Sequence, residues 1–302
     1  METNKSKQKI TPFLWFEDRA EEALEFYASI FPNSRIDFLH RWPKGSDFPE
    51  GTVRTASITL DGFTLYAFDA PPMADFNTSI SFFVTLETRD QVDAVWTELS
   101  KDGKVLMDLD SYSWSPRYGW VIDRFGISWQ INMGKIGEVG QRVCPCLMYS
   151  GDHKGKAEEA LEKHMSLFEG SSLVGISRYG AAQKGNEGLI NHAQFELAGQ
   201  TFMSMDNGMD DEVPFNESIS LYVTCRDQGE VDHFWDGLIQ GGGAEAQCGW
   251  LKDPYGTLWQ IVPDFLDEKI VQGDPQKVEQ MMQAVYKMKK INVAQLKASY
   301  NQ

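Results

Sequence analysis

The sequence has few cysteines, few histidines and no long run of apolar residues. A membrane-spanning helix needs about 20 consecutive apolar residues, and no stretch of the 302-residue chain comes near that length. The N-terminal residues 1–9 are polar, and no apolar segment of the kind found in signal peptides follows them. Four cysteines in so long a chain argue against a disulfide-stabilised scaffold. We therefore expect a cytoplasmic protein that makes no contact with a membrane.

Positive charge is also scarce, because the formal net charge is −16. A protein that binds nucleic acid neutralises phosphates with a basic surface. The densest basic cluster here is Lys287, Lys289 and Lys290, which we interpret as the solvated face of a helix. The composition thus predicts no nucleic-acid partner. It is compatible with a small-molecule ligand and with a monomer or a homodimer.

Familiar motifs of catalysis and cofactor binding are missing as well. Gly241-Gly242-Gly243 follows a predicted helix instead of opening one, so it indicates a helix end and not a dinucleotide-binding turn. Cys144-Pro145-Cys146 has two interpretations: half of a metal or redox site, or two small residues of a buried strand. The second is favoured because no further CxxC motif or histidine pair accompanies it.

What the sequence does contain is an internal repeat. Segments 119–131 and 249–261 share Gly-Trp, then Asp and Gly, then Trp-Gln-Ile, at an offset of 130 residues. Segments 76–81 and 215–220 match at an offset of 139. The difference predicts an insertion in the first copy, which we place in an extra loop over residues 108–116.

Both copies give the same order of predicted elements. A short apolar strand (12–16 and 145–149) precedes an amphipathic helix (20–31 and 156–168). Strands with alternating apolar and polar residues follow, then a second helix (89–101 and 228–240) and two closing strands. The pattern predicts an α+β fold of two tandem modules, residues 1–137 and 141–265. Helices are expected on one sheet face, and a mostly polar, concave surface on the other.

A C-terminal helical extension, residues 274–302, is expected to follow. Asp274 is the predicted N-cap and Pro275 the first-turn residue. Apolar residues recur at helical spacing along it: Val278, Met281, Met282, Val285, Met288 and Ile291. Such a stripe could be a ligand or partner surface. We favour packing against its own domain or a second subunit.

Three segments resemble a known family. The run 15–27, the pair of runs 247–253 and 259–263, and the run 192–199 are similar to PhnB-like proteins, also called 3-demethylubiquinone-9 3-methyltransferase-like domains. These belong to the glyoxalase/bleomycin-resistance, or vicinal oxygen chelate, superfamily. The resemblance implies paired βαβββ units that form a curved sheet around a pocket. In that superfamily the pocket often holds a divalent metal ion.

The positions that match the family's metal ligands carry too few metal-binding residues in this sequence, because only the two glutamines could ligate, weakly, through their carbonyl oxygens. The resemblance implies His, Glu or Gln at these positions, and the chain has prolines, serines and glutamines: Pro12, Pro145, Ser79, Ser218, Gln130 and Gln260. A catalytic divalent ion normally needs about three anionic or imidazole ligands. We therefore expect no metal and no cofactor.

Five residues are predicted to line a ligand pocket: Trp120, Gln130, His192, Trp250 and Gln260. His192 shares the polar side of its strand with Gln194 and Glu196 and could act as a general base, but no partner is evident. Trp120 and Trp250 could stack on a planar ligand or belong to the core. The strand-end residues Asp69 and Asp206 could bind a ligand or a metal ion, although solvated turn aspartates are commoner.

The sequence thus predicts metal-independent binding of a small organic ligand in the pocket. The alternative is a metal-dependent lyase, isomerase or dioxygenase of the vicinal oxygen chelate type. Methyl transfer, which the family description suggests, is the weakest candidate, because no S-adenosylmethionine-binding turn is present. The sequence assigns no catalytic residue.

Overall fold

A computed structural model describes residues 8–209 and 211–302, and the polar segment 1–7 lies outside the described residues. The strands of the first repeat are β1 (Ile10–Phe16), β2 (Ser34–Arg41), β3 (Val53–Leu60), β4 (Phe63–Asp69), β5 (Ile80–Leu86), β6 (Lys104–Tyr112), β7 (Ser115–Ile122) and β8 (Ser128–Met133). Those of the second are β9 (Val143–Tyr149), β10 (Ser172–Arg178), β11 (Ile190–Leu197), β12 (Gln200–Asp206), β13 (Ile219–Cys225), β14 (Ala244–Glu245), β15 (Trp250–Lys252) and β16 (Leu258–Pro263).

The helices lie between groups of these strands and after the last one. They are α1 (Ala20–Ile30), α2 (Arg89–Ser100), α3 (Ile136–Val139), α4 (Ala157–Leu167), α5 (Gln228–Ile239), α6 (Asp264–Gln272), α7 (Pro275–Val285) and α8 (Val293–Tyr300), with a short 3₁₀ turn at Gly151–His153. The predicted repeat of strands and helices, and the α+β class, are confirmed. No helix among the described residues is both long and apolar enough to cross a membrane.

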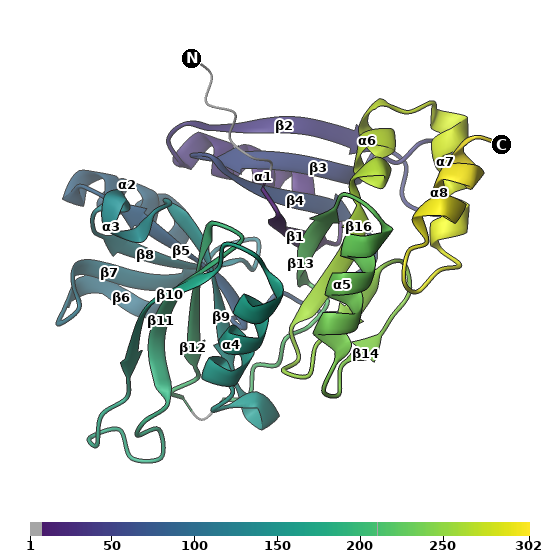
Figure 1. Ribbon diagram of the computed structural model, residues 1–302. Coiled ribbons are helices and arrows are strands. Elements are labelled where there is room, and N and C mark those ends of the chain that lie inside the picture. Colours follow the sequence, from purple (N-terminus) through teal and green to yellow (C-terminus); the bar gives the residue numbers. More distant parts are fainter. Residues whose placement is uncertain (1–7, 210) are drawn as a thin grey trace.

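The strands form two eight-stranded sheets, and each sheet takes four strands from each repeat. Sheet A has the order β14-β15-β16-β13-β1-β4-β3-β2, and sheet B the order β10-β11-β12-β9-β5-β8-β7-β6. Antiparallel pairs join the repeats, with Leu14 opposite Ile219 in sheet A and Ile80 opposite Leu147 in sheet B. Figure 1 shows the two sheets beside each other. Each sheet is therefore built from both sequence repeats, and neither repeat forms a sheet by itself.

The helix-covered faces of the two sheets meet in one continuous apolar core. A buried aspartate links the halves of each repeat across it. Asp123, in the turn before β8, accepts hydrogen bonds from Tyr27 Oη of α1 at 2.7 Å and from Trp129 Nε1 at 2.8 Å. The second repeat repeats this arrangement around Asp253. There, Trp259 Nε1 lies 2.9 Å and His164 Nε2 2.8 Å from the carboxylate.

The C-terminal helices cover the other face of sheet A, and in Figure 1 they lie on the side away from sheet B. Asp274 caps α7 as predicted, because its carboxylate accepts from the backbone N–H groups of Gln276 and Lys277. The apolar stripe packs on the protein's own sheet, next to Tyr222 and Val262.

The extension is not one helix, as the spacing had suggested, because α7 ends at Val285. The chain then turns so that the carbonyls of Met288 and Lys289 accept the N–H groups of Cys248 and Gly249, at 2.7 and 2.8 Å. Helix α6, which begins directly after β16, was not predicted from the sequence. A second expectation is also wrong: the insertion at 108–116 lengthens the β6–β7 hairpin and is no separate loop.

Candidate ligand-binding site

The faces of the sheets opposite the helical core are the candidate sites, and we call them cup A and cup B. Cup A is the face of sheet A that carries Phe13, Tyr222 and Gln260, and cup B the face of sheet B that carries Phe83 and Gln130. The five predicted lining residues divide between the cups. Trp250 and Gln260 lie in cup A, and Trp120, Gln130 and His192 in cup B.

Cup A holds a cavity of about 820 Å³ under α6, α7 and α8. Small-molecule sites in proteins commonly have volumes of about 300–1,000 Å³ and mostly apolar walls. Aromatic rings dominate this wall: Phe13, Trp15, Phe38, Trp42, Phe48, Tyr66, Phe68, Tyr222, Trp250, Phe265 and Tyr286. The expected polar surface is wrong for this cup. Apolar residues are favoured here because the C-terminal helices shield the face from water.

The two predicted glutamines have different partners. Gln130 Nε2 donates to Ser81 Oγ at 2.8 Å, and its Oε1 accepts from Tyr118 Oη at 2.7 Å. In cup A, Gln260 Nε2 donates to Ser220 Oγ at 2.8 Å, and no described residue donates to its Oε1. Cys248 stands where the repeat offset would place a second tyrosine, and although it lines the cavity it offers no phenol hydroxyl to Gln260. Gln260 therefore presents an unused acceptor at the floor of the cavity.

The two predicted tryptophans also differ in whether a ligand can reach them. Trp120 is 6% exposed, and its Nε1 donates to Ser128 Oγ at 2.8 Å, so it is a core residue of cup B. Trp250 lines the cavity of cup A, and its ring centroid lies 6.1 Å from that of Trp15. A planar ligand therefore has an aromatic surface available in cup A.

Cup B is packed with its own side chains. Phe83, Tyr118, Met148 and Met203 are all buried there. His192 lies beside them, with its ring 5.8 Å from that of Phe83. Burial lowers the pKa of His192, so the imidazole is neutral at pH 7. No hydrogen bond joins it to another described residue, which leaves it without the partner that orients a general base.

The thiols of Cys144 and Cys146 are also buried in cup B. Burial raises the pKa of each to about 12. A thiol with so high a pKa stays protonated near neutral pH and is a poor nucleophile and metal ligand. Of the two interpretations of the CxC pair, the buried strand fits these contacts.

The donor groups of the cups do not fit a divalent metal ion. At the floor, the glutamines present amides whose N–H groups are held by serine hydroxyls. Among the described residues, no three His, Cys, Asp or Glu side chains come close enough to share an ion. A floor made of neutral amides and hydroxyls lacks the anionic or imidazole ligands that such ions require.

The strand-end aspartates are structural, and the expectation that they are solvated is wrong. Asp69 is 2% exposed, and its carboxylate accepts the N–H groups of Ala20 at 2.9 Å and Val53 at 2.8 Å. Asp206 makes the equivalent bonds to Ala157 and Ile190. Each carboxylate therefore anchors a helix start and a strand start, where buried N–H groups need acceptors.

Arg54 is a cavity residue that the sequence pattern did not identify. The pairing of β2 and β3 is irregular at this point, since Thr55 lies opposite His40 and Val53 opposite Arg41. A bulge of this kind redirects a side chain from the regular alternation, and Arg54 lines the cavity. Its guanidinium lies 5.3 Å from the Trp42 ring centroid. The second repeat has Asn191 at this position, a difference that could have drawn attention to it.

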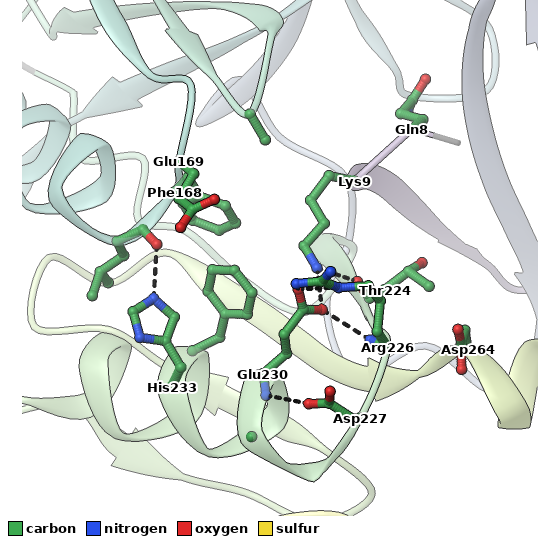
Figure 2. Close-up of a pocket in the computed structure, with 14 residues that line it drawn as sticks. Gln8, Lys9, Phe168, Glu169, Thr224, Arg226, Asp227, Glu230, His233 and Asp264 are labelled. Atoms are coloured by element: carbon green, nitrogen blue, oxygen red, sulfur yellow. Dashed lines mark hydrogen bonds and ion pairs between the residues drawn. The ribbon is translucent and has the colours of Figure 1, made fainter. Parts of the chain in front are cut away.

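A second cavity, of about 730 Å³, lies where Gln8 and Lys9 meet α4 and α5 (Figure 2). Its two cations are already paired with Glu230. Lys9 Nζ lies 2.7 Å and Arg226 Nη2 2.6 Å from Glu230, and Lys9 Nζ also donates to the Thr224 carbonyl. His233 Nε2 lies 2.8 Å from the Leu167 carbonyl. Paired charges leave few groups to recognise a ligand, so we favour cup A.

Comparison with known proteins places the chain in a family. The family described as 3-demethylubiquinone-9 3-methyltransferase matches residues 8–132 and 141–262. Protein YjdN from Escherichia coli (strain K12) is 26% identical over 142 residues, which are 42% of this chain and 95% of YjdN. A PhnB protein from Bacillus cereus is 40% identical, covering 42% of this chain and all of its own, with a TM-score of 0.41.

A two-module protein has the same fold over most of the chain. Glyoxalase I from Zea mays is 10% identical and covers 87% of this chain and 97% of its own, with a TM-score of 0.58. Two successive family matches, with a fold like that of glyoxalase I, agree with the repeat and the sheet topology. The chain belongs to the 3-demethylubiquinone-9 3-methyltransferase (PhnB-like) family, within the vicinal oxygen chelate fold.

Proposed function

We propose that this protein binds one small, partly aromatic organic molecule in cup A, without a metal ion. The observation that carries the proposal is the aromatic cavity of about 820 Å³ with the Gln260 Oε1 acceptor unused at its floor. Aromatic walls supply affinity by removing apolar surface from water, and a few polar groups fix orientation. Cup B offers no such acceptor, because Tyr118 already donates to Oε1 of Gln130.

The proposal is tested with 1-aminoanthracene, a neutral fluorescent aromatic molecule. We expect saturable binding of one dye per chain, quenching of tryptophan emission by energy transfer, and no change after treatment with EDTA. Trp250→Ala should weaken binding about tenfold, because one stacked aromatic contact contributes about 0.5–1.5 kcal/mol beyond its buried area. His192→Ala, in cup B, is the matched control and should leave affinity unchanged.

Three results would replace the proposal. If Trp250→Ala and His192→Ala weaken dye binding equally, the dye does not bind specifically in cup A. One tightly held metal ion per chain in the purified protein would favour the lyase, isomerase or dioxygenase alternative. Saturable S-adenosylmethionine binding in a calorimeter would favour the methyl transfer that the family description names.

A further inference from the structure

The Arg54 guanidinium forms no ion pair and no side-chain hydrogen bond with a described residue, and its Nη2 atom is buried without a partner. Most other arginines pair with a carboxylate: Arg19, Arg35, Arg41, Arg117, Arg142, Arg178 and Arg226. A buried donor without an acceptor costs free energy. An anionic oxygen bound at this wall would supply the acceptor that the Arg54 guanidinium lacks.

The surroundings of Arg54 also fix how a ligand would approach it. Trp42 stacks on Phe48 with ring centroids 4.0 Å apart, and the guanidinium lies over the Trp42 ring. Trp42 is itself held by a hydrogen bond from its Nε1 to the Asp69 carbonyl at 3.0 Å. A guanidinium placed on a fixed aromatic ring keeps its planar fork of N–H donors free for a carboxylate.

We propose that the ligand of cup A is an aromatic carboxylate whose charged group binds Arg54 while its ring lies among the aromatic side chains of the wall. This inference rests on the proposed function, since it assigns the chemical class of the same ligand. Gln260 Oε1, at the floor, accepts a hydrogen bond from a hydroxyl or amino group on the ring.

Acidic residues on another wall determine the orientation of the ligand. Asp264, Asp267 and Glu268 of α6 line the cavity and repel an anionic group. Asp267 accepts from the Tyr222 hydroxyl, and Glu268 lies 2.7 Å from Lys269 Nζ. A second cation, Lys297, lies over the Phe265 ring at 5.4 Å and also lines the cavity. The carboxylate is therefore directed away from α6.

The test compares acids with their neutral amides as competitors of 1-aminoanthracene. The pairs are 3-phenylpropanoate with 3-phenylpropanamide, and 2-naphthoate with 2-naphthamide. In the wild-type protein each acid should displace the dye at a lower concentration than its amide. Arg54→Gln should weaken the acids roughly 10- to 100-fold, the range for a hydrogen bond to a charged group, and change the affinity of the amides and the dye much less. Arg54→Lys should restore part of the acid affinity.

Lys297→Gln is the matched control, because it removes one positive charge from the same cavity. If both substitutions weaken the acids equally, the preference is a general electrostatic effect and the Arg54 contact is wrong. If the acids have no advantage over the amides in the wild type, the proposed ligand class is wrong. In either case, if the wild type still binds the dye, the proposed function stands. If the wild type does not bind the dye at all, both the proposed function and the proposed ligand class are wrong.

Discussion

The hydrogen bond between Tyr27 and Asp123 should contribute measurably to stability, because it links the two sheets. Tyr27 lies on α1, which packs on sheet A, and Asp123 lies in the turn between two strands of sheet B. Both side chains are buried, and burial raises the pKa of the Asp123 carboxyl. In Tyr27→Phe the carboxylate keeps its bonds from Trp129 Nε1 and from the N–H groups of Phe125 and Ile127. One of its four bonds is lost.

A hydrogen bond to a charged group contributes about 1.5–3 kcal/mol. With a urea m-value of about 3 kcal/mol/M, Tyr27→Phe should lower the unfolding midpoint by about 0.5–1 M. The midpoint is followed by tryptophan fluorescence and circular dichroism. Tyr286→Phe is the control, because Tyr286 is 42% exposed and its hydroxyl makes no hydrogen bond to a described residue. A Tyr27→Phe midpoint equal to that of the control would refute the assigned role of this bond.

Two further predictions concern charge and packing. Burial raises the pKa of Glu230, but hydrogen bonds from Lys9 and Arg226 outweigh this effect and lower it to about 2. Glu230 therefore stabilises the fold above its ordinary pKa of 4.5, and this contribution disappears as the pH falls to about 2. The urea midpoints of wild type and Glu230→Gln should differ at pH 6 and converge at pH 2; a constant difference would contradict this. Met281 is fully buried, so Met281→Ala should cost about 2–5 kcal/mol in chemical unfolding, and an unchanged midpoint would mean that α7 is not packed on sheet A.

The repeat was readable from the sequence because its markers have a structural reason. Asp123 and Asp253 each hold the turn before a closing strand and the tryptophan six residues later, so their spacing is fixed by the hydrogen bonds. Gln130 and Gln260 directly follow those tryptophans in the same strands. Because successive side chains of a strand point to opposite sheet faces, the glutamines point into the cups. Helix positions could be predicted for a similar reason, since the apolar spacing of α1 and α4 records which residues enter the core.

Pairing between repeats could not be predicted in this way. A strand such as β5 shows from its residues that both faces are buried, but not that one neighbour is β9 of the other repeat. The side chains of equivalent strands are alike, so pattern alone does not choose between a partner in the same repeat and one in the other. The role of Arg54 was hidden for a different reason: a bulge breaks the alternation that would have placed it on the helical face.

The two cups differ although they have the same glutamine–serine floor. In cup B, Tyr118 extends from the long β6–β7 hairpin and binds the Gln130 carbonyl, so the floor is satisfied from within. In cup A, β15 is short, Cys248 replaces the tyrosine, and its N–H pairs with the carbonyl of Met288 in the C-terminal extension. The extension thus closes cup A from above without reaching the floor, which leaves the cavity beneath it. Since only this cup combines a free amide oxygen with an unpaired guanidinium, binding should saturate at one ligand per chain and not at two.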